Sequence, residues 1–233
     1  MIKKLAVFVE GHTEQEFTIR LLTELAGKRG IAFEVQEQHH GQLSFVEIRT
    51  SNVSSTQPHE IQVLVANCCN DAQVKSQIKD RYNSLLGAGY SLIVGLRDVY
   101  PLSHSEINDL LRFMPEGLPK GAVPIHMHLA VMEIEAWFLE ETTHFSRIDS
   151  AITSNEIIAN GFDYQNSRAH ELGHPAETLD AIYKSVGKRY SKNKRQIQRT
   201  VRKLSYEELY INTRPKAPTL DGFIATLEVG LFS

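Results

Sequence analysis

The sequence predicts an α/β protein with a mainly parallel sheet flanked by helices, followed by a C-terminal helical region. Short apolar runs alternate with helical patterns through roughly the first 140 residues. These runs are apolar at successive positions, which is typical of parallel strands buried on both faces. Beyond about residue 142 only helical patterns remain. We therefore expect an α/β core over residues 1–140 and a helical appendage over 141–233.

The expected strands are rich in β-branched and aromatic residues and cover 5–9, 31–35, 61–66, 90–96 and 123–131, with one more at 45–48 inside a polar stretch. Helices are expected to begin near residues that can cap them, namely Thr13, Asn70 or Asp71, and Ser103 or Ser105. The helices expected in the appendage cover 176–186, 194–209 and 220–231.

The bulk composition fits an intracellular enzyme. A chain of 233 residues that is 42% hydrophobic can bury a substantial core. Glu10 interrupts the first apolar run, so neither a signal peptide nor a membrane span is expected, and we predict a cytosolic protein. The adjacent Cys68 and Cys69 are poorly placed for a disulfide or a zinc cluster, and are expected to be small apolar residues at the end of a strand.

The basic residues are unevenly distributed. The segment from Lys184 to Lys203 contains nine Lys or Arg residues and no acid, while the rest of the chain has 16 basic and 28 acidic residues. This pattern suits a protein that binds a polyanion such as DNA or RNA at one place, although a solvated helix face is the alternative. One continuous helix would carry these cations as a stripe, unless residues 190–193 break it. The expected nucleic-acid contacts are Lys188, Lys192, Lys194, Arg195, Arg199 and Arg202.

Acidic residues follow three of the expected strands. Glu10 follows the first, Asp98 follows the strand at 90–96, and Glu133 and Glu135 follow the strand at 123–131. Parallel sheets place their chemistry at the carboxyl ends of the strands, and carboxylate oxygens are the ligands that Mg²⁺ prefers. Glu133 and Glu135 share a face only if strand geometry persists to them; on a helix one of them points away, and Glu133 is then the expected inner residue. A Mg²⁺ or Mn²⁺ site is expected here.

These acidic segments resemble the motifs of Toprim-type domains. The matching stretches are Val9-Glu10-Gly11-His12-Thr13-Glu14 with Phe17, then Arg97-Asp98-Val99-Tyr100, then Glu133-Ile134-Glu135. They are most similar to an uncharacterised bacterial Toprim-like family whose genes often neighbour ATPases, and the similarity covers roughly residues 4–140. The resemblance implies a nuclease or related phosphodiester enzyme acting on DNA or RNA, with a role in defence against phage or other mobile elements. It also implies an ATPase as a partner, and leaves a homo-oligomer open.

The same resemblance implies roles for single residues. Glu10 would transfer a proton and contribute to metal binding, while Asp98, Glu133 and Glu135 would hold the metal, so that Glu10, Asp98 and Glu133 form the catalytic set. Tyr100 stands where Toprim enzymes usually have the second acid of Asp-x-Asp, and its phenol is a poor Mg²⁺ ligand near neutral pH. A non-catalytic module that binds nucleic acid or a partner is therefore the alternative function.

The stretch His170-Glu171-Leu172-Gly173-His174 matches the zinc motif of metalloproteases. That motif requires one helix that places both histidines on the same face. Pro175 disfavours helical geometry at His174, and Gly173 weakens the helix further. Zinc proteolysis is thus a less favoured alternative. No phosphate-binding glycine motif follows a strand, which disfavours nucleotide hydrolysis by this chain.

Overall fold

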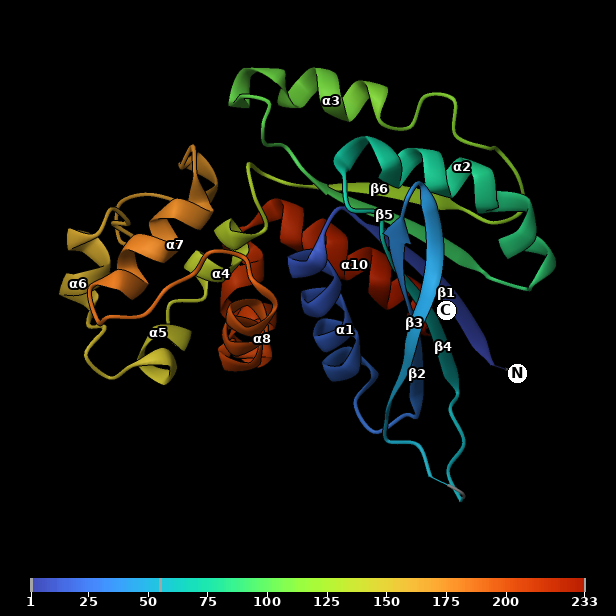
Figure 1. The fold of residues 1–233 in the computed structure, drawn as a ribbon, viewed down its shortest axis with the longest axis horizontal. Coiled ribbons are helices and arrows are strands. Elements are labelled where there is room, and N and C mark those ends of the chain that lie inside the picture. Colours follow the sequence, from blue (N-terminus) through green and yellow to red (C-terminus); the bar gives the residue numbers. More distant parts are fainter. Residues whose placement is uncertain (1, 55, 233) are drawn as a thin grey trace. The chain divides into compact units, whose positions relative to one another are not determined.

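The computed structural model describes residues 2–54 and 56–232 and contains one six-stranded sheet in the order β3-β2-β4-β1-β5-β6 (Figure 1). The strands are β1 (Lys3–Val9), β2 (Ile31–His39), β3 (Gln42–Ser51), β4 (Ile61–Asn67), β5 (Leu92–Asp98) and β6 (Ile125–Ala130). The helices that accompany them are α1 (His12–Ala26), α2 (Asp71–Gly87), α3 (Ile107–Phe113) and α10 (Pro218–Phe232). The predicted α/β class with a mainly parallel sheet is confirmed.

The sheet is parallel except at one edge. β1 pairs in parallel with β4 and β5, β2 pairs in parallel with β4, and only β3 runs antiparallel to its neighbour β2. β6 follows the direction of β5, because Ile93 N–H donates to Pro124 O and Val99 N–H donates to Ala130 O at the same spacing along both chains. Glu10 directly follows β1, and Asp98 is the last residue of β5. Both therefore lie at the carboxyl ends of neighbouring parallel strands.

Helices cover both faces of the sheet. Val74, Ile78 and Tyr82 of α2 pack with Ala6 and Phe8 of β1 in one buried cluster. The neighbouring residue Leu5 points to the opposite face, since successive side chains alternate along a strand. There α10 lies so close that a Cβ added at Gly230 would stand 2.5 Å from Leu5 Cδ2, and Figure 1 shows α1 beside α10 on this face.

The chain forms two compact units. One contains residues 1–97, 109–129 and 222–233, and therefore most of the sheet; the other contains 98–108 and 130–221. The second unit is helical and is built from α4 (Glu135–Glu140), α5 (His144–Ile148), α6 (Ser154–Ala159), α7 (Pro175–Lys184), α8 (Lys194–Lys203) and α9 (Tyr206–Glu208). Short 3₁₀ turns occupy His104–Glu106, Ala169–Glu171 and Arg214–Lys216, and a π-helical turn occupies Leu209–Thr213. The core of the helical unit includes the fully buried aromatic side chains of Trp137, Phe138, Phe145, Phe162 and Tyr183.

Several boundaries differ from those expected. Helix α1 begins at His12 with Gly11 at its N-cap, so the capping role expected for Thr13 is wrong. β2 and β3 form a long hairpin through the polar stretch where only 45–48 was expected as a strand. The helix expected over 194–209 ends at Lys203, and Ser205 caps the short α9 that follows. Cys68 and Cys69 are free thiols just after β4, the first buried and the second exposed.

Candidate functional site

Glu133 and Glu135 follow β6 in a tight turn of the helical unit. Met132 adopts a left-handed backbone with φ of 57°, and α4 begins at Glu135 with Ile134 at its N-cap. The chain therefore leaves strand geometry before Glu133, and Ile134 already has right-handed helical dihedral angles (φ −57°, ψ −24°). Glu133 thus lies in the turn and Glu135 is the first residue of the helix, so the two glutamates do not both belong to one strand or one helix.

Both glutamate side chains reach the same ammonium group. Lys192 Nζ lies 3.0 Å from Glu133 Oε1 and 3.1 Å from Glu135 Oε2. Strand geometry was expected to be the condition for convergence of the two acids, and that expectation is wrong because the turn achieves it. Glu133 was expected to be the inner residue, yet Glu135 is fully buried and Glu133 is 8% exposed.

The remaining carboxylate oxygens are held by other groups of the same unit. Tyr190 O–H donates to Glu135 Oε1 at 2.6 Å, and the Ala176 backbone N–H, in the first turn of α7, donates to Glu133 Oε2 at 2.8 Å. Glu135 Oε2 is buried, and the group that faces it is the ammonium of Lys192. Burial raises the pKa of Glu135, while Lys192 and the Tyr190 hydroxyl act in the opposite direction. Glu133, Glu135, Tyr190 and Lys192 are called the acidic cluster below.

Asp98 is connected to the acidic cluster through the backbone. It ends β5 and is 6% exposed, and its Oδ1 accepts a hydrogen bond of 3.0 Å from the Ile134 N–H. Ile134 lies between the two glutamates in sequence, so Asp98 fixes the turn that presents them. The structure thus brings Asp98, Glu133 and Glu135 into one neighbourhood of the helical unit.

The acidic cluster has the donor chemistry of a site for a hard cation. Its ligating atoms are carboxylate oxygens, and Mg²⁺ is usually held by one or two carboxylates together with waters and substrate phosphates. Within residues 2–54 and 56–232, no three His, Cys, Asp or Glu side chains form a ready metal-binding group. The place between Glu133 and Glu135 is taken by the ammonium of Lys192. A divalent ion held by this pair therefore competes with Lys192 for the oxygens.

Glu10 belongs to the other compact unit. It follows β1 in the short connection to α1 and is half-buried. Two further acids of this unit, Glu14 and Glu16, are buried on the first turns of α1. Arg49 of β3 binds both oxygens of Glu16, at 2.9 and 3.0 Å.

Tyr100 stands where the resemblance expects a second acid, and its side chain is a phenol. Its side chain is 44% exposed, and its ring meets the His174 ring edge-on with the centroids 5.5 Å apart. Its backbone N–H donates to Met132 O, so Tyr100 lies against the turn that carries Glu133. The position equivalent to the second acid of Asp-x-Asp is therefore an exposed phenol beside a histidine.

The basic segment is divided between internal ion pairs and an exposed helix. Residues 188–193 precede α8, so the continuous helical stripe does not form. Lys188 binds Asp149, and Lys192 belongs to the acidic cluster. Arg199 is half-buried over the Tyr183 ring, 5.4 Å from its centroid. The exposed cations of α8 are Lys194, Arg195, Arg202 and Lys203.

The stretch 170–174 lacks the helix that a zinc protease motif needs. Ala169–Glu171 is a single 3₁₀ turn, and α7 begins only at Pro175, with His174 at its N-cap. The Glu171 carboxylate accepts the Arg168 N–H and so closes its own turn. His170 instead lines a small cavity of about 180 Å³ with Glu140 and Trp137.

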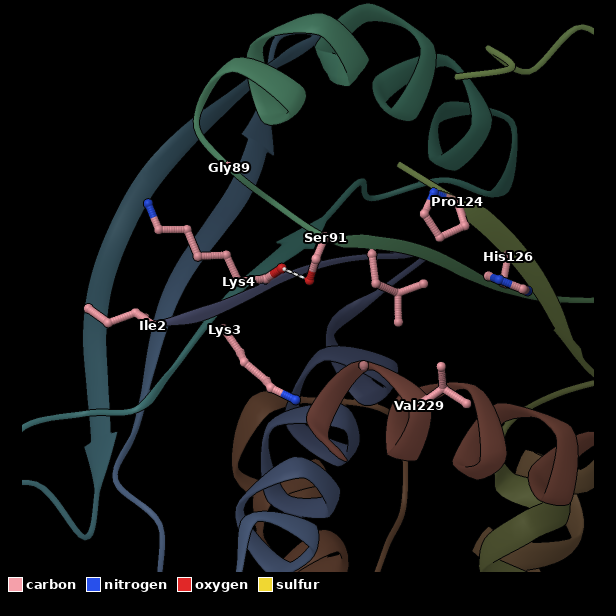
Figure 2. A pocket seen from close by; sticks show the side chains of 10 residues that line it. Ile2, Lys3, Lys4, Gly89, Ser91, Pro124, His126 and Val229 are labelled. Atoms are coloured by element: carbon pink, nitrogen blue, oxygen red, sulfur yellow. Dashed lines mark hydrogen bonds between the residues drawn. The ribbon is translucent and has the colours of Figure 1, made fainter. Parts of the chain in front are cut away.

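A larger cavity, of about 390 Å³, lies at the amino ends of the strands in the sheet-containing unit (Figure 2). Among the described residues, its lining includes Lys3, Lys4, Ser91, His126 and Val229 and no acid. The ammonium groups of Lys3 and Lys4 point in different directions in Figure 2, and Lys4 Nζ donates to Ala88 O. This cavity therefore lies at the amino ends of the strands, whereas Glu10 and Asp98 lie at the carboxyl ends.

Sequence patterns predicted the acids of the acidic cluster and missed how they are neutralised. Lys192 stood out only as one cation of a basic run, and Tyr190 only as part of a break in it. Their contacts span 59 residues from Lys192 to Glu133 and 55 from Tyr190 to Glu135. No local spacing connects residues so far apart.

Comparisons with models of protein families, with curated proteins and with solved structures found no match. In the described part of the chain, no helix combines the length and the apolar character needed to cross a bilayer.

Proposed function

We propose that this chain is a metal-dependent phosphodiester enzyme, most simply a cytoplasmic nuclease that acts on DNA or RNA, with a role in defence against phage or mobile elements. The observation that carries the proposal is the convergence of Glu133 and Glu135 on one cation position, with Asp98 bound to the turn between them. Buried carboxylates that share a cation at the end of a parallel strand are suited to holding a divalent ion beside a phosphate.

The chain's own residues prepare this position. Asp98 orients the turn through the Ile134 N–H, and the Ala176 N–H and the Tyr190 hydroxyl each fix one glutamate oxygen. Lys192 neutralises the pair before any other cation arrives. When bound, Mg²⁺ or Mn²⁺ would supply the charge that stabilises a phosphate under attack.

Glu133 and Glu135 would hold such an ion, and Asp98 would support them. The resemblance adds Glu10 as the residue that transfers a proton. An ammonium displaced from the two carboxylates would stand close to an incoming phosphate, which also attracts it.

A second function is favoured by a specific observation. Tyr100 occupies the position of an expected acid, and Lys192 already satisfies the glutamate pair. A module that binds nucleic acid or a protein partner without cleaving it would tolerate both features. This alternative predicts binding without turnover.

A cleavage assay separates the two functions. Purified protein is incubated with single- and double-stranded DNA and RNA in Mg²⁺, in Mn²⁺ and in EDTA, with and without an ATPase of the kind that the resemblance implies as a partner. We expect cleavage that needs the divalent ion. Glu10→Gln should lower the rate by about 100-fold or more, which is the scale on which loss of an acid–base group acts. Asp98→Asn and Glu133→Gln should also lower the rate strongly, because they weaken the site that would hold the divalent ion.

Glu177→Gln is the matched control, because Glu177 is an exposed acid on α7 of the same unit. Circular dichroism of each variant checks that the fold is retained. Binding without cleavage in every condition would support the non-catalytic alternative. Cleavage that persists in all three variants would assign the activity to another protein in the preparation.

A further inference from the structure

Strand β3 forms one open edge of the sheet. It is ten residues long, and in the strand order it neighbours only β2 (Figure 1). An edge strand presents backbone N–H and C=O groups that can pair with a strand of another chain. Natural proteins commonly protect such edges with lysine or proline, and β3 contains neither.

β3 also exposes large apolar side chains. Phe45 is 60% exposed and Ile48 is 57% exposed. The register places Phe45 opposite Gln36 and Ile48 opposite Glu34, so both lie on the α2 face of the sheet, where Arg81 of α2 binds Gln36. The cover provided by α2 thus reaches β2 but leaves these two side chains of β3 open to solvent.

The charges of β3 are complementary to those of a second, antiparallel β3. Glu47 and Arg49 flank Ile48 symmetrically, and within one chain Arg49 binds both Glu47 and Glu16, so any pair across the axis would extend this existing ionic network. A twofold axis at Ile48 would place Glu47 of each copy opposite Arg49 of the other, and would bring the two Ile48 side chains together. Cross-strand pairs of opposite charge and of apolar residues are both stabilising, and twofold dimers are the commonest symmetric assemblies.

We propose that β3 pairs antiparallel with β3 of a second copy of this chain, so that one sheet continues across a twofold axis at Ile48. The bulge between Val35 and Gln36, which leaves Val46 without a partner on β2, strengthens the local twist of this edge. The interface uses residues remote in sequence from the acidic cluster, so it stands independently of the proposed enzymatic function.

The molar mass in solution tests the interface. We expect the unmodified protein to be a dimer by light scattering, and Ile48→Lys, which would bring two ammonium groups together at the axis, to have half that mass. Leu111→Lys is the control, because Leu111 is an exposed apolar residue on α3, 49% exposed, and should leave the dimer intact. An unmodified protein that stays monomeric as its concentration rises, or a dimer that survives Ile48→Lys, would overturn the proposal.

Cysteine cross-linking tests the register. In a Cys69→Ser background, Ile48→Cys should form an intermolecular disulfide rapidly, since directly opposed residues have Cα atoms about 4.5–5.5 Å apart. Phe45→Cys should react slowly, because three residues from the axis on each strand separate the two copies by roughly 20 Å. Equal rates for the two variants would contradict an axis at Ile48.

Discussion

Glu135 shows how a buried carboxylate is stabilised in this protein. Isolation of an ionised group from water costs several kcal/mol, and a buried pair persists only when its remaining hydrogen-bonding groups are satisfied. Lys192 supplies the counter-charge and Tyr190 supplies a donor to the oxygen that Lys192 does not contact. The cluster is therefore sensitive to the loss of any one of its members.

Tyr190→Phe tests this sensitivity. The change keeps the buried ring and removes only the hydroxyl that donates to Glu135 Oε1. We expect the free energy of unfolding to fall by about 1–3 kcal/mol, which is the typical cost of a buried polar atom left without its partner. Urea unfolding monitored by circular dichroism provides the measurement. Tyr164→Phe serves as the control at a partly exposed tyrosine, and equal losses in the two variants would contradict the role given to Tyr190.

His144 makes stability depend on pH. Its ring is fully buried, and burial lowers its pKa from 6.5 to about 4, while Arg147 lowers it further and a hydrogen bond to Glu141 O opposes the shift. The unfolded chain then binds a proton at higher pH than the folded chain does. The stability associated with neutral His144 is therefore present above pH 6.5 and is lost as the pH falls toward 4.

The difference between His144→Phe and the unmodified protein isolates this effect. Between pH 7 and pH 5 the unmodified protein should lose about 2 kcal/mol more stability than the variant does. Glu141 faces His144, and burial raises its pKa, so its contribution to stability grows as the pH falls. Both proteins contain Glu141, and its contribution therefore cancels to first order in the comparison. Urea midpoints at the two pH values give the comparison, and parallel pH profiles would show that His144 does not titrate as described.

Among the elements, α10 depends on a glycine for its approach to the sheet. A Cβ at Gly230 would stand 2.5 Å from Leu5 Cδ2 and 2.7 Å from Leu92 Cδ2. Gly230→Ala should therefore lower the free energy of unfolding by about 1–3 kcal/mol through overpacking, although alanine favours helix. Gly222→Ala is the matched control on the same helix, because its nearest neighbour outside the helix would be 3.9 Å away. If Gly230→Ala proves as stable as the control, the close contact is not maintained in solution.

Helix α8 carries the exposed part of the basic segment. Gln replacements of Lys194, Arg195, Arg202 and Lys203 should weaken nucleic-acid binding and reduce the slope of log affinity against log salt by about one for each cation that contacts duplex phosphate. Arg199 is left intact because it packs over Tyr183. Fluorescence anisotropy across a salt series measures both quantities. Affinity and slope equal to those of the unmodified protein would show α8 to be a solvated helix face.

The elements that the sequence predicts well are those whose residue pattern depends mainly on burial. β1, β4 and β5 each contain a nearly continuous apolar run because both faces of the sheet are covered there, and that pattern is visible without a structure. β3 escapes such prediction because most of its residues are exposed, and its length follows from pairing with β2. The start of α1 was misplaced because Thr13 fits a local capping pattern, while the chain turns into the helix at Gly11.

The candidate site likewise contains some residues that the sequence predicts and others that it does not. Glu10, Asp98, Glu133 and Glu135 follow strand ends, and strand ends are predictable from apolar runs. Lys192 is not assignable from its neighbours in sequence, since tertiary packing of residues 190–193 against the turn after β6 decides its partner. The basic segment, which the sequence suggests is one stripe, divides into a lysine that pairs with acids of the same chain and an exposed helix.

At the scale of the whole molecule, the charge distribution fits a protein that engages a polyanion. The net charge is −3, and the exposed cations of α8 stand out from an otherwise acidic chain. A carboxylate cluster repels phosphate, so it must be neutralised by a cation before nucleic acid can approach it. Lys192 neutralises it in this structure, and the proposed function requires that a divalent ion can take over this role.

Titration with Mn²⁺ tests that requirement most directly, with bound and free ion distinguished by electron paramagnetic resonance. The unmodified protein should bind one Mn²⁺, and the affinity should fall strongly in the Glu133→Gln, Glu135→Gln double variant, with circular dichroism used to confirm its fold. Lys192→Met should bind Mn²⁺ at least about tenfold more tightly, because the competing unit charge is removed. Equal Mn²⁺ binding by all three proteins would contradict a cation site at the acidic cluster.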